Sequence, residues 1–303
     1  MPRATSNEMM QLRQRMQQMM QMQGMTKSVE KIDYALLRET MNAASERMPS
    51  EPGVTFTSED LNGVEVELST PNQMSGDDII IYLHGGGFTC GNARASRGFA
   101  SQLAGETGLR VYSVSYRLAP EHPYPAAPDD CFTVYIAILS KYPGIKISLI
   151  GDSAGANLSL VTTLRAMDAG IPLPTSITLY SPPADVTGKI DRTRFSATDF
   201  IIGAELESEI RALYFPNNNP DHPYISPLYG NFEGFPPLKI VTDSTEVLAD
   251  DADLLAEKAQ MAGVQVDYQK WDGTFHAFAT TGRGTPESLQ VLQETAQFIK
   301  KHF

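Results

Sequence analysis

Ser153, which has a glycine two residues away on each side, lies in a sequence context that is typical of a reactive hydroxyl. The segment Gly151-Asp152-Ser153-Ala154-Gly155 follows the strand-like apolar run 147–150. A serine at such a junction lies on a sharp strand-to-helix turn that exposes its hydroxyl for attack on a carbonyl. Apolar residues at 158, 160, 161 and 164 then have the spacing of a buried helix. The alternative interpretation is a helix N-terminus that Asp152 and Ser153 only cap.

A serine hydroxyl becomes a good nucleophile only when a base takes its proton and a third group orients that base. Among five histidines, His276 lies in the segment 273–278, after the last predicted strand and before the last predicted helix. From there it could reach over the sheet edge. His302 is next to the C-terminus, and His122 and His222 each precede a proline. We therefore expect His276 to be the base, its alternative role being that of a structural histidine.

The segment after the apolar run 238–241 offers four carboxylates: Asp243, Glu246, Asp250 and Asp251. If Asp250 and Asp251 open the helix that runs to residue 262, they cap it and interact favourably with its dipole. Glu246 or Asp243 then remains to hold the imidazole.

A glycine-rich segment, His84-Gly85-Gly86-Gly87-Phe88, follows the most hydrophobic strand candidate, residues 79–83. Consecutive glycines leave backbone N–H groups free to bind a developing negative oxygen, and the N–H of Ala154 would complete the set. Removing one such donor typically costs about 10²- to 10³-fold in rate. The segment lacks G-x-G-x-x-G and the Walker lysine, so it does not fit a nucleotide-binding loop.

Strand-like and helical stretches alternate from about residue 54 onward. The strand candidates are residues 64–68, 79–83, 110–114, 147–150, 177–180, 238–241 and 264–268. Such alternation predicts an α/β fold with a mainly parallel sheet covered on both faces, and functional residues at the carboxyl ends of its strands.

Residues 183–227 interrupt this alternation. They include Thr193-Arg194-Phe195, a helical piece near 205–214 and the turn-rich stretch 216–220, with no comparable strand candidate. We interpret the segment as an insertion that covers the site.

The N-terminal residues are rich in methionine and glutamine. Met9, Leu12, Met16 and Met19 share one face of an amphipathic helix. The favoured interpretation is a helix packed on the body of the protein. A pliable wall or lid over an apolar substrate site, and a disordered or membrane-touching tail, are the alternatives.

Composition excludes several classes of function. The chain has 303 residues and a formal charge of −12, from 24 basic and 36 acidic residues, so nucleic acid is not an expected partner. No apolar stretch reaches about 18 residues, and no secretory leader pattern opens the chain, which predicts no membrane span and a cytoplasmic protein. Cys90 and Cys131 lack metal-ligand spacing. We expect neither a metal nor a cofactor.

Three motifs occur together in one order. They are His84 to Phe88, the segment 116–126 (YRLAPEHPYPA) and Gly151 to Gly155. With them the chain, from about residue 78 to 302, resembles the hormone-sensitive lipase family of α/β-hydrolase esterases. The resemblance implies an α/β-hydrolase fold with a helical cap. It places N-terminal cap helices in residues 1–50, the catalytic domain in 51–303 and a cap insertion at about 183–227.

The resemblance also implies a catalytic triad. Ser153 corresponds to the nucleophile and His276 to the base. The family's acid motif reads aspartate, proline, a large apolar residue, any residue, aspartate. The corresponding run here is 246–250, so the acid position holds Glu246, and Asp243 is the reserve candidate.

Further roles follow from the same motifs. The resemblance assigns the oxyanion N–H donors to Gly85, Gly86 and Ala154. It gives His84 a role in shaping the oxyanion loop and Glu121 a place in the supporting network.

The resulting prediction is a serine carboxylesterase that hydrolyses short- to medium-chain carboxylic esters of small molecules through an acyl-enzyme. Related esterases often dimerise through sheet edges, so a homodimer is a candidate assembly. The alternatives are a lactone, amide or carbamate hydrolase at the same site, or a non-catalytic ligand-binding member of the fold. The plant gibberellin receptors are such members and have lost the catalytic histidine, so the presence of His276 favours an enzyme.

Overall fold

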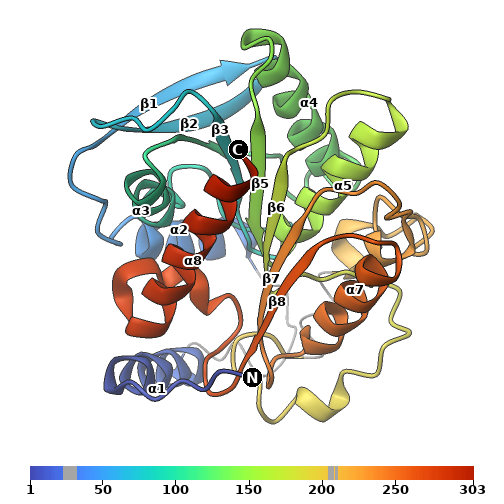
Figure 1. Ribbon diagram of the computed structural model, residues 1–303. Helices are drawn as coiled ribbons and strands as arrows, with labels where there is room; N and C mark the ends of the chain where they lie inside the picture. Colours follow the sequence, from blue (N-terminus) through green and yellow to red (C-terminus); the bar gives the residue numbers. More distant parts are fainter. Residues whose placement is uncertain (23–32, 204–207, 209–210) are drawn as a thin grey trace.

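An eight-stranded sheet forms the centre of the protein in the computed structural model, which describes residues 1–22, 33–203, 208 and 211–303 (Figure 1). Its strands stand in the order β1-β2-β4-β3-β5-β6-β7-β8. Only β2 is antiparallel to its neighbours, and all other pairs are parallel. The strands are β1 (Val54–Leu61), β2 (Val64–Pro71), β3 (Ile79–Leu83), β4 (Arg110–Val114), β5 (Ile147–Asp152), β6 (Ser176–Tyr180), β7 (Leu238–Asp243) and β8 (Val266–Trp271).

The predicted α/β fold with a mainly parallel sheet is confirmed. All seven strand candidates are present, and β1 is an additional edge strand. Residues of β1 alternate in burial only weakly and several are exposed, so its sequence carries a poor hydrophobic signal.

Helices cover both faces of the sheet. On one side lie α4 (Ala126–Lys141), α5 (Ala154–Asp168) and α7 (Ala249–Met261), and on the other α3 (Arg97–Thr107) and α8 (Pro286–His302) (Figure 1). Side chains alternate between the faces of a strand. In β3, Ile79, Ile81 and Leu83 therefore join the core beneath α4, α5 and α7, while Ile80 and Tyr82 join the core beneath α3 and α8.

The methionine-rich N-terminus forms α1 (Asn7–Met22), which is followed by α2 (Tyr34–Ser45). Met9 is fully buried, and Leu12 and Met16 are partly buried against the core on the α3 and α8 side, so the packed-helix interpretation is confirmed for these residues. Met19 is 45% exposed and does not share their burial.

The residues before α1 are held against the sheet. Arg3 forms a parallel bridge with Asp272, directly after β8. The Glu287 carboxylate at the start of α8 accepts hydrogen bonds from the N–H groups of Thr5 and Ser6, at 3.0 and 2.9 Å. This carboxylate lies at the N-terminus of α1, where the helix dipole favours a negative charge.

Segment 183–227 contains no strand among its described residues. It includes the short 3₁₀ helix η1 (Thr193–Phe195). Half of the helical piece predicted near 205–214 lies outside the described residues, and its described residues, 208 and 211–214, are helical.

Asp251 fixes this segment to α7. It is fully buried, and its carboxylate accepts hydrogen bonds from the N–H groups of Ala184 and Asp185. It also forms an ion pair with Arg192 at 2.6 Å. Asp250 pairs with Arg194. The prediction that both aspartates cap α7 is therefore wrong. They lie in its first turn, but their carboxylates bind the preceding segment instead.

In the described part of the chain, no helix is long and apolar enough to cross a membrane.

Candidate active site

Ser153 lies at the junction of β5 and α5 with a left-handed backbone conformation, φ 49° and ψ −121°. Two glycines make this turn feasible. A Cβ at Gly151 would overlap the carbonyl of Gly155, and a Cβ at Gly155 would overlap the carbonyl of Leu83 on the neighbouring strand. The Ser153 hydroxyl makes no capping hydrogen bond to α5, so the capping interpretation does not hold. A strained backbone that presents a hydroxyl is typical of a nucleophile.

His276 lies in the loop after β8 and is 8% exposed, the same fraction as Ser153. Its loop reaches the serine turn through the end of β6. The N–H of Ser153 donates to the Tyr180 carbonyl at 2.8 Å, and the N–H of Ala277 donates to the Ser181 hydroxyl at 2.9 Å. The two segments therefore meet at consecutive residues of one strand end, as expected for the carboxyl edge of a parallel sheet.

Glu246 is the carboxylate in contact with this imidazole. Its Oε2 lies 2.7 Å from Nδ1 of His276, and the side chain is 1% exposed. Its other oxygen, Oε1, accepts from the Thr242 hydroxyl and from the N–H of Asp243 at 3.4 Å.

Asp243, the reserve candidate, has other partners. Its Oδ2 accepts from the N–H and hydroxyl of Thr274, at 2.8 and 2.6 Å, and its Oδ1 accepts from the N–H of Thr245 at 2.8 Å. Asp243 thus ties the end of β7 to the loop that carries His276. The structure brings Glu246, and not Asp243, against the imidazole.

Three carboxylates influence the imidazole. Burial alone lowers the pKa of His276, but the charge of Glu246 and the hydrogen bond to it outweigh that effect, with smaller contributions from Asp199 and Asp152. The net pKa of His276 is therefore above its ordinary value. A histidine with a raised pKa is a stronger base, and its protonated form is stabilised by the adjacent anions.

The oxyanion loop requires one correction. The N–H of Gly85 is not free, because it donates to Oδ1 of Asp152 at 3.0 Å. Among the described residues, the N–H groups of Gly86, Gly87 and Ala154 make no hydrogen bond. Gly86 and Gly87 have φ values of 113° and 59°, which glycine adopts readily. Of the two glycines predicted as donors, Gly85 therefore has a paired N–H and Gly86 an unpaired one, and the N–H of Gly87 is also unpaired.

Asp152 joins the serine turn to this loop. It is 9% exposed, and its Oδ1 also accepts from the Tyr82 hydroxyl at 2.5 Å. Burial raises the pKa of Asp152, while the Tyr82 hydrogen bond opposes that shift.

His84 is a buried structural group at the start of the loop. Its ring stacks on Tyr116 with centroids 4.2 Å apart, and the Tyr116 hydroxyl donates to the His84 carbonyl at 2.7 Å. Burial lowers the pKa of His84 to about 4, so its ring is neutral near pH 7. This contact fits the predicted role of His84 in shaping the loop.

Glu121 reaches the site through Arg38, a residue of α2 that sequence reasoning missed. Arg38 donates to the carbonyls of Thr89 and Ala119, both at 2.6 Å, and pairs with Glu121 at 2.7 Å. One guanidinium therefore connects α2, the residues after the glycine loop and the 116–126 motif. No sequence signal marks it, because a lone arginine in a predicted helix is usually a solvated residue.

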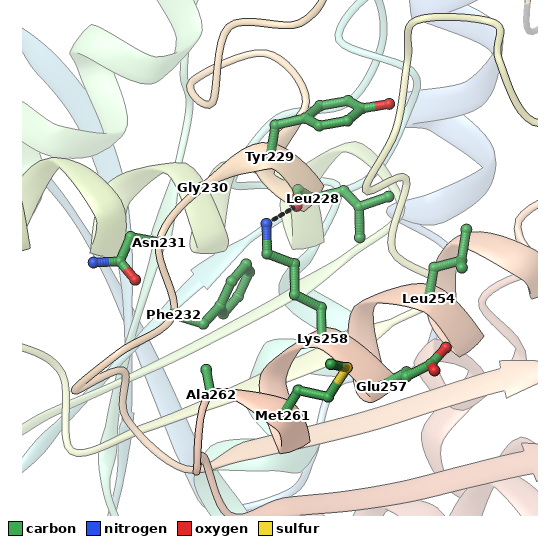
Figure 2. A pocket seen from close by; sticks show the side chains of 10 residues that line it. All are labelled: Leu228, Tyr229, Gly230, Asn231, Phe232, Leu254, Glu257, Lys258, Met261 and Ala262. Carbon is green, nitrogen blue, oxygen red and sulfur yellow. Dashed lines mark hydrogen bonds between the residues drawn. The ribbon is translucent and has the colours of Figure 1, made fainter.

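A separate surface pocket of about 580 Å³ lies between the distal half of α7 and the residues after the 3₁₀ helix η2 (Pro227–Tyr229) (Figure 2). Phe232, Leu254 and Met261 line it, and Lys258 donates to the Leu228 carbonyl at 2.6 Å. It contains none of the predicted site residues. In the described residues, no group of three or more His, Cys, Asp or Glu side chains is arranged to hold a metal ion.

Comparisons with known proteins show the family of the chain. A family described as alpha/beta hydrolase fold matches residues 80–280. An esterase of Acinetobacter venetianus is 34% identical over 267 residues, which cover 86% of this chain and 87% of the relative. An acetyl-hydrolase of Streptomyces hygroscopicus is 34% identical over 224 residues, 73% of this chain and 75% of the relative.

Among solved structures, a hormone-sensitive lipase from a metagenome library superimposes with a TM-score of 0.87 and 31% identity. The superposition covers 96% of this chain and 98% of that chain. The family match and these relatives show that the chain belongs to the hormone-sensitive lipase family of the α/β-hydrolase fold and is a carboxylic-ester hydrolase.

Proposed function

We propose that Ser153, His276 and Glu246 are the catalytic triad of this esterase. The 2.7 Å contact between Glu246 and Nδ1 of His276 is the observation that carries the proposal. It directs the other ring nitrogen, Nε2, to accept the serine proton, because a carboxylate on Nδ1 fixes the tautomer.

In this mechanism Ser153 attacks the ester carbonyl while His276 takes its proton. The imidazolium that forms is stabilised by Glu246 and then protonates the leaving alcohol. Water repeats the sequence on the acyl-enzyme, with His276 as base again.

We assign the oxyanion donors to the N–H groups of Gly86, Gly87 and Ala154. The support is that these three groups lack protein acceptors among the described residues, whereas the N–H of Gly85 donates to Asp152. Donors fixed in advance stabilise the developing charge without reorganisation during the reaction.

We also propose a preference for short- to medium-chain acyl groups, and a cap made of α1, α2 and segment 183–227. One support is the acetyl-hydrolase relative. Another is the ring of Tyr214, from that segment, which stacks on Phe88 of the oxyanion loop with centroids 3.8 Å apart and both side chains buried. Aromatic rings packed here restrict the space beside the loop. A homodimer and a cytoplasmic location remain predictions.

The test is the variant Ser153→Ala with p-nitrophenyl butyrate as substrate. We expect kcat to fall to the residual level of about 10³- to 10⁴-fold over water that the remaining groups provide. Ser159→Ala, in the same helix but bonded to a backbone carbonyl, is the matched control and keeps its activity.

A panel of acyl chains of increasing length, with a lactone and an anilide, measures the substrate range on the same proteins. Near-normal turnover by Ser153→Ala would overturn the assignment. A fluorophosphonate probe that fails to label wild-type protein would instead favour the ligand-binding alternative.

A further inference from the structure

Asp199, in segment 183–227, is a further carboxylate that acts on the imidazole of His276, in addition to Glu246 and Asp152. Asp199 is 9% exposed and lines a narrow cavity that has no room for a water molecule. The cavity is also lined by Phe200, Phe275, Glu246 and His276. Because Asp199, Glu246 and His276 are all buried, their charges interact in a medium of low dielectric constant and are poorly screened.

The Asp199 carboxylate is fixed by backbone hydrogen bonds. Its Oδ2 accepts from the N–H of Val247 at 2.9 Å, directly after Glu246. Its Oδ1 accepts from the N–H groups of Ile201 and Ile202, both at 2.9 Å. Three N–H donors favour the ionised form of a carboxylate. The side chain therefore holds a negative charge beside the backbone that carries Glu246.

The charge of Asp199 acts on His276 by electrostatic attraction and not by a direct hydrogen bond. Glu246 binds the imidazole directly, and Asp152 and Asp199 add weaker attraction. Asp152 is already bonded to Tyr82 and the oxyanion loop. From α1, the Arg13 guanidinium lies 5.6 Å from the centroid of the Phe200 ring.

The pKa of Asp199 reflects the same environment. Burial and the like charge of Glu246 raise it, while the charge of His276 and the backbone hydrogen bonds oppose that shift, and the net pKa of Asp199 is above its ordinary value. The geometry thus places an anion in the cavity that Glu246 and His276 also line, where it attracts the protonated imidazole.

We propose that Asp199 is a positioning residue of the esterase, which acts through His276 by supplying a second negative charge to the imidazolium and by docking segment 183–227 against Glu246. The proposal rests on the triad assigned above. Its consequence is that the basicity of His276 depends on the seating of that segment, so the part of the chain proposed to select substrates also sets the strength of the base.

The experiment compares the pH dependence of kcat/KM for p-nitrophenyl butyrate in Asp199→Asn, Asp199→Ser and Asp199→Glu. The first two remove the charge, and the third retains it. Asp191→Asn is the matched control, because exposed Asp191 accepts comparable local hydrogen bonds from Thr193 but does not line the cavity. Melting temperatures are recorded for every variant.

We expect the acid limb of the profile to move to lower pH by about 0.5 to 1 unit in the two neutral variants, because removing an anion destabilises the imidazolium. One pKa unit corresponds to at most about a tenfold change in rate, because the imidazolium charge is only partly developed in the transition state, so kcat should fall by up to roughly three- to tenfold, with a smaller change in KM. Asp199→Glu and Asp191→Asn should keep the wild-type midpoint.

A lower melting temperature with an unchanged midpoint in Asp199→Asn and Asp199→Ser would show a purely structural role and overturn the proposal. An unchanged profile and an unchanged kcat would do the same. Glu246→Gln is measured alongside. If it moves the midpoint while the Asp199 variants do not, the triad stands and only this inference fails. If Ser153→Ala remains active, the triad itself fails.

Discussion

Replacing Glu246 by glutamine is a direct test of the carboxylate partner of His276. Oε1 of Glu246 accepts hydrogen bonds from two donors, the Thr242 hydroxyl and the N–H of Asp243. The Asp243 N–H cannot accept a bond, so the amide oxygen of the glutamine should take this position. Its NH₂ group must then face Nδ1 of His276, where Oε2 now lies at 2.7 Å.

An NH₂ group on Nδ1 stabilises the wrong tautomer. Nδ1 becomes an acceptor, and the ring proton moves to Nε2, the nitrogen that has to receive the serine proton. Loss of the correct tautomer in triads of this kind costs about 10⁴-fold in kcat. We therefore expect Glu246→Gln to reduce kcat by roughly 10³- to 10⁴-fold while the protein remains folded.

Asp243→Asn is the matched comparison. In this variant we expect a clear loss of stability and only a small loss of activity. Both oxygens of Asp243 accept from backbone N–H groups, those of Thr245 and Thr274, each at 2.8 Å. An asparagine must turn its NH₂ group toward one of these donors, which leaves a buried N–H unpaired at a cost of about 1–3 kcal/mol. We expect a lower melting temperature and a loss of activity of about tenfold or less, because the imidazole keeps its partner.

The assay is kcat and KM for p-nitrophenyl butyrate from pH 5.5 to 9.5, with thermal unfolding of both variants under the same conditions. Glu246→Gln should also move the acid limb to lower pH, since Glu246 raises the pKa of His276. The reverse ranking, with Asp243→Asn folded but less active than Glu246→Gln, would refute the assignment and transfer the acid role to Asp243.

Two further results are expected. Arg38→Met should lower kcat/KM by about three- to tenfold and reduce the melting temperature, because the carbonyls of Thr89 and Ala119 lose their donor. The control is Arg15→Met, on an exposed part of α1. Equal values of kcat/KM and melting temperature in the two variants would contradict the role of Arg38. The raised pKa of His276 should stabilise the folded protein below pH 6.5 and lose that contribution as pH rises through the folded-state pKa. The difference in melting temperature between wild type and His276→Asn should therefore be larger at pH 5.5 than at pH 9, and a constant difference would contradict the raised pKa.

The sheet and the serine turn were predictable from sequence because their signals are local. The strand before Ser153 is a mainly apolar run, and Gly151 and Gly155 are required where no Cβ fits. His276 could be chosen by its position after the last strand. The strand β1 has no comparable pattern, since it lies at the sheet edge with much of its surface exposed.

Contacts between distant segments were not predictable in the same way. The sequence of the glycine loop does not reveal which N–H donates to Asp152, so the predicted set of donors included Gly85. Asp251 looked like a helix cap because it opens α7, yet its partners Ala184 and Arg192 are about 60 residues away in the sequence. Arg38 and Asp199 lie outside every motif, and only the fold brings them to the site.

The hydrogen bond between Asp152 and Gly85 means that the two most recognisable motifs of the chain are not independent. A Cβ at position 85 would overlap the Asp152 carboxylate, so a side chain at 85 would force this carboxylate away from its hydrogen bond to the N–H of residue 85. Among homologues, the two positions should therefore change together. A chain with a small neutral residue in place of the aspartate would lose this overlap, so the residue before the serine in one motif would predict the residue after the histidine in the other.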